Sequence, residues 1–133
     1  MVKVCLILLL SLVFPVMELR AGELHSGEFQ KKKEKITGSF TILESDGKTI
    51  LVLSDNFKTK NGPDLQIVFS PMTFSAINGK NALDKGAVSL GLMKSNKGGQ
   101  RYELPADLDL AKMKSILIHC VKYTRLWGGA PLN

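Results

Sequence analysis

Apolar and polar residues alternate with a period of two along most of the chain, which is typical of β-strands with one buried face. The clearest case is the run from Ile36 to Ile42, in which every second residue would share an apolar face. Asp46-Gly47 follows, a pair favoured in tight hairpin turns, and the branched apolar run 49–53 then leads back. Residues 35–53 are therefore predicted to form a β-hairpin.

Further strands follow the turn-forming sequence Asn61-Gly62-Pro63-Asp64. Alternation over 65–70 predicts a third strand, and 72–86 reads as a partly ordered loop. The alternating segments 88–92 and 100–104 flank a glycine-rich turn, so we expect them to pair as a second hairpin.

The C-terminal part contains one short helical turn and the most apolar strand. Asp107 or Asp109 would cap a turn carrying Leu110 and Met113. Residues 115–121 are apolar on both faces, which predicts a central strand, and 124–127 would form a last strand before Gly128-Gly129. Seven or eight short strands with one helical turn predict an all-β fold, an antiparallel β-sandwich or small barrel.

The first 21 residues have the layout of a secretory signal peptide. Lys3 precedes an apolar run that is too short to span a bilayer, and Ala21 and Gly22 are small residues suited to cleavage. A retained membrane anchor is the alternative. We expect residues 1–21 to be removed and 22–133 to form a single exported domain, periplasmic or extracellular.

Removal of the leader changes both the charge and the cysteine count. The 18 basic and 12 acidic residues of the full chain fall to 16 and 11, because Lys3, Arg20 and Glu18 are lost. Nucleic acid is not an expected partner of an exported protein. The densest basic cluster consists of Lys31, Lys32, Lys33 and Lys35. It is either the solvated start of a strand or a surface that is weakly attracted to an anionic membrane.

Conventional catalytic motifs are absent from the sequence, which contains no GxSxG, HExxH, CxxC, GxxxxGKS/T or GxGxxG. Cys120 would be the only thiol of the mature protein. It is either a small core residue or a thiolate stabilised by a nearby cation, with Lys122 and Lys114 as candidates. His119 should point to the opposite face of the same strand, so the two residues are not expected to share a metal ion, and no metal site is predicted.

From Gly27 onward the order of motifs resembles the DM-thirteen domain, a small all-β module found beside DOMON domains in animal cell-surface proteins. The matching segments are Gly27-x-Phe29, Ile36-Thr-Gly38-x-Phe40, Leu53-x-x-x-Phe57, Asn61-Gly-Pro-Asp-Leu65, Leu90-Gly-Leu92 with Lys94, Gly99-Gln-x-Tyr102-x-Leu-Pro105, Lys114-Ser-Ile-Leu-Ile-His-Cys120 and Trp127-Gly-Gly-Ala-Pro-Leu132. They cover nearly all of the expected mature chain, so it resembles one free-standing copy.

The resemblance implies extracytoplasmic electron transfer centred on Cys120, either as a bare thiol or as a ligand to a prosthetic group such as haem. The cofactor is left unknown, since the sequence requires none. Cys120 is the candidate redox residue, and His119, Tyr123 and Trp127 are the residues expected around it. An aromatic residue often precedes the family's cysteine, and His119 stands there in this chain.

Two functions follow as hypotheses. The first is an exported accessory redox or electron-transfer module that uses Cys120, with no stand-alone catalytic activity expected and its redox partner or envelope protein unknown. The second is a binding or structural β module without chemistry, which the lack of a catalytic dyad favours.

Overall fold

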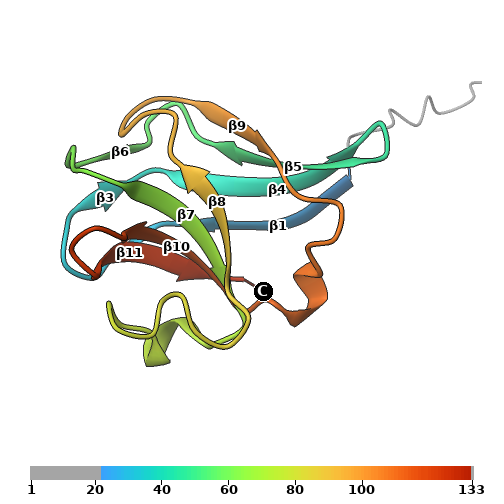
Figure 1. The fold of residues 1–133 in the computed structure, drawn as a ribbon. Helices are drawn as coiled ribbons and strands as arrows, with labels where there is room; N and C mark the ends of the chain where they lie inside the picture. The colour runs from blue at the N-terminus through green and yellow to red at the C-terminus, as the bar shows by residue number, and fades with distance from the viewer. Residues whose placement is uncertain (1–21, 133) are drawn as a thin grey trace, which may run out of the picture.

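The computed structural model describes residues 22–132 and has two antiparallel sheets packed face to face (Figure 1). The first sheet has the order β1 (Gly22–Glu28), β4 (Ser39–Ser45), β5 (Lys48–Leu53) and β9 (Gln100–Glu103). The second has the order β2 (Gln30–Lys31), β11 (Arg125–Pro131), β10 (Ser115–Cys120), β7 (Leu65–Ser70) and β8 (Val88–Leu92). The short strands β3 (Ile36–Thr37) and β6 (Lys58–Thr59) pair with each other at one end of the sandwich. The all-β prediction is confirmed.

The predicted hairpin at 35–53 is present in part, as β4 and β5, whereas Ile36 and Thr37 form β3 and pair with β6 instead of extending the hairpin. The strands pair from Phe40 with Leu53 up to Ser45 with Lys48. Asp46 and Gly47 form the turn with φ of 52° and 75°, the positive values that a two-residue hairpin turn requires.

The main core lies between the two sheets and is rich in phenylalanine. The Phe29 ring centroid lies 5.6 Å from that of Phe40 and 5.4 Å from that of Phe57. Inward residues of both sheets surround these rings, including Leu51 and Ile118, and burial of this apolar surface is the main stabilising contribution to the fold.

Strand β10 is central and buried on both faces, as its sequence predicts. Its outer face is covered by the segment 71–87, which runs below the second sheet in Figure 1 and contains the 3₁₀ turn η1 (Phe74–Ala76). Ile77 and Ala82 of this segment pack in one cluster with Val68, Leu117 and Leu126 of the sheet. This second cluster explains why β10 has no exposed face.

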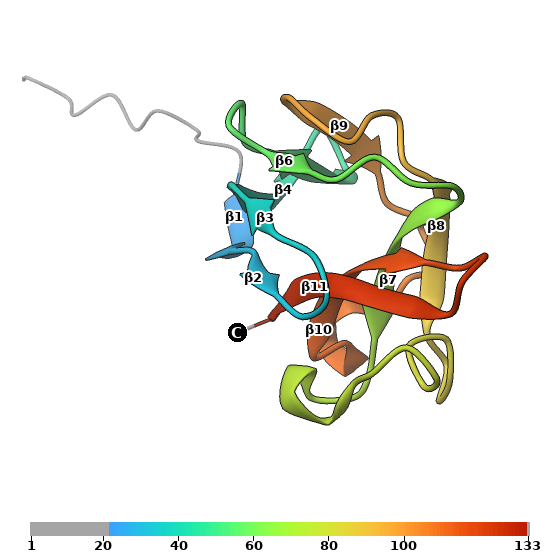
Figure 2. The same cartoon turned by 90° about the vertical axis from the view of Figure 1, so that its left-hand side faces the viewer.

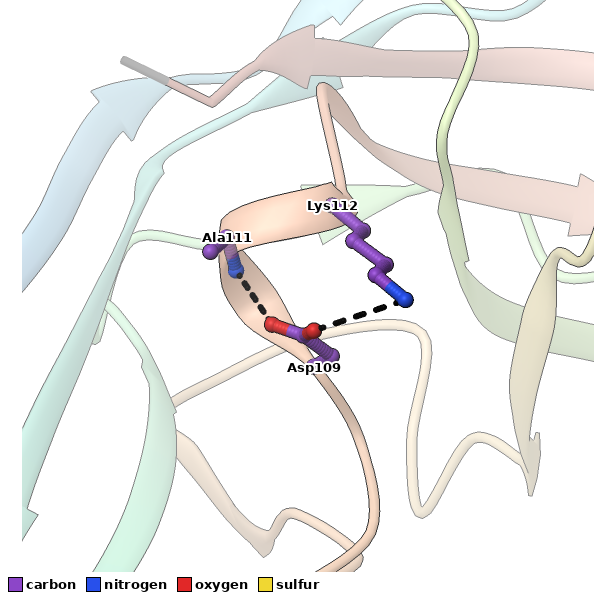
Figure 3. Close-up of polar contacts among 3 residues, drawn as sticks. All are labelled: Asp109, Ala111 and Lys112. Carbon is purple, nitrogen blue, oxygen red and sulfur yellow. Dashed lines mark hydrogen bonds and ion pairs between the residues drawn. The ribbon is translucent and has the colours of Figure 1, made fainter.

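The predicted helical turn is the 3₁₀ turn η2 (Leu110–Lys112), shown in Figure 3. The Asp109 side chain accepts a hydrogen bond from the Ala111 amide at 3.1 Å, and its carboxylate lies 3.9 Å from the Lys112 ammonium. Asp109 is therefore the capping residue of the two candidates.

The predicted second hairpin is wrong. Strand β8 pairs with β7 in one sheet, whereas β9 pairs with β5 in the other. The connection 93–99 therefore crosses between the sheets, and the Met93 amide donates to the Leu65 carbonyl at its start. An alternating segment indicates which of its faces is buried, but the partner strand depends on contacts that are distant in sequence.

The N-terminal segment and the last strand also differ from expectation. Residues 22–28, for which the sequence predicts no strand, form β1 and pair with β4. Strand β11 does not end before Gly128 but runs through both glycines to Pro131. The predicted leader lies outside the described residues, so export stays a prediction. Within 22–132 no helix is long and apolar enough to cross a membrane.

Candidate functional site

Cys120 is the last residue of β10 and faces the core between the sheets. Its side chain is 1% exposed, and its Sγ donates a hydrogen bond to the Pro63 carbonyl at 3.1 Å. The inward direction follows from the alternation along β10, in which Ile116 and Ile118 also belong to the main core. Cys120 is a free cysteine that is buried rather than open to solvent.

The turn 61–64 covers this thiol and connects it to Trp127. Pro63 is exposed, so a single turn of backbone separates Sγ from solvent. The Val121 amide donates to the Asp64 carbonyl at 3.1 Å and fixes the turn to the end of β10. A Cβ on Gly62 would lie 2.7 Å from two ring carbons of Trp127, so the indole packs directly against this backbone.

Trp127 reaches the core because β11 contains a bulge. Ile118 pairs with Gly128 and His119 pairs with Leu126, which leaves Trp127 as the extra residue between them. Its side chain is 4% exposed and belongs to the same core cluster as Cys120. Its carbonyl accepts three backbone N–H groups, from Lys32, Lys33 and Glu34, at 2.8–3.1 Å.

His119 lies on the opposite face of β10 from Cys120, toward the segment 71–87. It is 1% exposed, and its Nδ1 has no hydrogen-bond partner. Burial lowers the pKa of His119, and the nearby Asp64 carboxylate opposes this shift in part. Asp64 itself accepts from the Gln66 side chain at 2.7 Å, beside the register position of His119.

This buried imidazole predicts a pH-dependent stability. The folded-state pKa of His119 lies below the unfolded value of about 6.5, so the unfolded state binds the proton more readily. The free energy of unfolding should therefore fall as pH decreases through about 6.5 toward the folded pKa, and stay level above that window. His119→Phe should remove most of this slope in urea titrations between pH 5 and 8. His25, present in both proteins, serves as the internal control, and an unchanged slope in the variant would contradict the assignment.

Tyr123 lies outside the site predicted around Cys120. Its side chain is 64% exposed in the turn between β10 and β11, and the Lys122 ammonium lies 5.7 Å from its ring centroid. Lys114, the other candidate cation, precedes the opposite end of β10. The structure thus places Cys120 and Trp127 in one core cluster, His119 in the buried layer on the opposite face of β10, and Tyr123 at the surface.

The basic cluster near the N-terminus is likewise divided by the structure. Lys32 donates to the Phe74 carbonyl at 3.0 Å, and its ammonium lies 4.5 Å from the centroid of that ring, so it holds η1 against the sheet. Lys31, Lys33 and Lys35 are exposed. Only these three are available for attraction to an anionic membrane surface.

A haem does not fit this arrangement. The Cys120 sulfur is enclosed by the turn 61–64 and hydrogen-bonded to Pro63, so a macrocycle would have to displace that turn to reach it. Within the described range 22–132, no group of three or more His, Cys, Asp or Glu residues gathers as a metal site.

The sequence indicates Cys120 and Trp127 as site residues, whereas it predicts the segment 61–64 only as a chain reversal. Its packing on both residues was not predicted, although Asn61 to Leu65 is one of the motifs that carries the family resemblance.

Comparison with known proteins agrees with that resemblance. The sequence model of the family described as electron transfer DM13 matches residues 28–132. No curated protein and no solved structure matches the chain. Since the match covers all the strands from β2 to β11, together with Cys120, Trp127 and the turn that covers them, the chain belongs to the electron transfer DM13 family.

Proposed function

We propose that the domain is an exported accessory redox module in which Cys120 exchanges electrons with a partner protein. The observation that carries the proposal is that Cys120 and Trp127 share one cover, the exposed turn 61–64. The family description supports electron transfer in general, and export rests on the predicted leader.

The chemistry suited to this geometry is thiol–disulfide exchange after the turn opens. Opening breaks the Sγ–Pro63 hydrogen bond, and the thiol loses its proton to water. The thiolate attacks a disulfide of the partner, forming a new S–S bond to one partner sulfur while the other leaves as a thiolate. The Cys120 sulfur is oxidised and the leaving sulfur is reduced. A thiolate of a reductant then attacks the partner sulfur of this mixed disulfide, forming a new S–S bond to it, and Cys120 leaves as a thiolate.

The alkylation rate of Cys120 in the native protein tests this proposal. Labelling with iodoacetamide from pH 5 to 9 should proceed faster than global unfolding, and a disulfide reagent should form a mixed disulfide. Cys120→Ser should abolish both reactions and leave the fold intact, since a serine hydroxyl can also donate to Pro63. Labelling at the rate of global unfolding would contradict a redox role.

A second candidate is a structural or binding module in which Cys120 is only a core residue. The observation in its favour is the 1% exposure of the thiol within the main apolar cluster. This alternative predicts that Cys120→Ser lowers the free energy of unfolding, while partner binding persists and no thiol reaction exists to be lost.

A further inference from the structure

The turn between β10 and β11 presents an aromatic side chain in a basic surface. Tyr123 is 64% exposed and lies between the exposed residues Lys122 and Arg125. Beside it is a surface hollow of about 390 Å³, lined by Lys33, Gly79, Tyr123, Thr124, Arg125 and Leu126. We call Lys33, Lys122, Tyr123 and Arg125 the Tyr123 surface.

The backbone of this turn is strained and closely packed. Thr124 has φ of 51°, a left-handed conformation that is rare for a β-branched residue. Gly79 packs against it so closely that a Cβ there would lie 2.1 Å from the Thr124 carbonyl oxygen. Strained backbone of this kind persists only where its surroundings enforce it, and such strain is concentrated at functional sites.

One of the two basic side chains that line the hollow is ion-paired. The Arg125 guanidinium lies 3.7 Å from the Glu34 carboxylate, whose backbone N–H in turn donates to the Trp127 carbonyl. An exposed tyrosine on a closely packed turn with basic neighbours has the composition of a binding hot spot rather than of an ordinary solvated loop.

Charge is distributed unevenly along the strand direction. The end of the sandwich that contains Cys120, which faces the viewer in Figure 2, carries more basic than acidic residues. Its exposed basic residues are Lys33, Lys35, Lys58, Lys60, Lys97, Lys122 and Arg125, and its acidic residues are the exposed Asp55 and the partly buried Glu34 and Asp64. The opposite end, around the β4–β5 turn, carries Glu23, Glu44, Asp46, Glu103, Asp107 and Asp109, of which Glu103 and Asp109 are ion-paired with Lys48 and Lys112. This separation would orient an acidic partner toward the Cys120 end.

We infer that the Tyr123 surface docks an acidic patch on a partner protein, with Tyr123 as the aromatic anchor. This inference rests on the proposed redox function and names its partner's chemistry. The Val121–Asp64 hydrogen bond joins this turn to the cover of Cys120, so a docked partner would lie next to the thiol. The concave surface favours a protruding acidic segment of a protein over a flat lipid bilayer.

The test uses a fluorescein-labelled peptide of repeating Glu-Glu-Leu, with fluorescence anisotropy at low ionic strength. The double variant Lys33→Glu/Lys122→Glu should weaken binding at least about tenfold. Lys85→Glu/Lys114→Glu has the same net charge but changes exposed residues outside this surface, and should weaken binding less than about threefold. Tyr123→Ala should weaken binding about fivefold, whereas Leu83→Ala, which truncates another exposed apolar residue, should not.

Several results would overturn the docking surface. Equal losses in both charge variants would mean a general charge effect, and no binding by the wild type would exclude an acidic protein partner. Binding to phosphatidylglycerol vesicles but not to the peptide would indicate a membrane, and self-association at low salt would indicate a second copy. Docking variants that bind normally while Cys120 still reacts would refute only this inference, whereas loss of the thiol chemistry with intact docking would refute only the proposed redox function.

Discussion

Gly129→Ala is expected to lower the free energy of unfolding by about 3 kcal/mol or more. A Cβ at this position would lie 2.2 Å from the Ile116 carbonyl oxygen and 3.0 Å from the Leu117 Cα. Both atoms belong to the backbone of β10, which is paired on one side with β7 and on the other with β11. Strand β10 cannot shift without breaking its hydrogen-bond register with β7 or β11. The clash can therefore be relieved only at a large cost in free energy.

Urea denaturation measures this loss, and Gly27→Ala is the matched control. At Gly27 the added Cβ would meet only the ring of Phe40, at 3.1 Å, and a side chain can adjust. We expect this control to lose less than about 1.5 kcal/mol. If Gly129→Ala unfolds at the wild-type urea midpoint, or if the two variants lose the same free energy of unfolding, the explanation by close approach of β10 and β11 at Gly129 is wrong.

The glycines of β11 show one limit of reading the sequence. Gly128-Gly129 was interpreted as the end of a strand, because glycine pairs are common in turns. The strand instead continues, since each glycine lets a neighbouring backbone approach: Gln30 at Gly128 and Ile116 at Gly129. A single sequence does not distinguish these two uses of glycine, because the approaching residues are distant in the chain.

Strand pairing shows a second limit. The β4–β5 hairpin was predictable because its turn residues, Asp46 and Gly47, and its two strands are contiguous in sequence. The segment 93–99 also has turn residues, yet it connects two sheets rather than two neighbouring strands. Local turn chemistry fixes a reversal of the chain, whereas the choice of sheet depends on the whole core.

Only part of the candidate site could be predicted from the sequence, because the rest depends on contacts between distant segments. Strand alternation correctly placed Cys120 and His119 on opposite faces. The contact of Trp127 with the turn that covers Cys120 depends on a bulge in β11, because a bulge changes which residues face inward. No local sequence pattern predicts this bulge. Proximity in sequence placed Tyr123 beside Cys120, but the intervening turn carries it to the surface.

Gly62→Ala is expected to raise the alkylation rate of Cys120 in the folded protein by about tenfold. The new Cβ would lie 2.7 Å from two carbons of the buried Trp127 ring, so either the indole or the turn 61–64 must move. The Trp127 ring is enclosed by the core, and the Trp127 backbone carbonyl accepts three N–H groups, whereas Pro63 next to Gly62 is exposed. The turn should therefore move, which lengthens the Sγ–Pro63 hydrogen bond. A tenfold increase in the alkylation rate corresponds to a decrease of about 1.4 kcal/mol in the free energy that opposes opening of the turn.

The measurement is iodoacetamide labelling followed by intact-mass analysis, with the unfolding rate of each variant measured in parallel. Asn61→Ala is the matched control, because it changes an exposed residue of the same turn and leaves the contact between Gly62 and Trp127 in place. Its labelling rate should stay within about twofold of the wild type. If Gly62→Ala accelerates labelling only as much as it accelerates global unfolding, the turn is not a separate cover for the thiol. Acceleration beyond the change in unfolding rate would show that Cys120 becomes accessible by local opening, the step that a redox exchange at this residue requires.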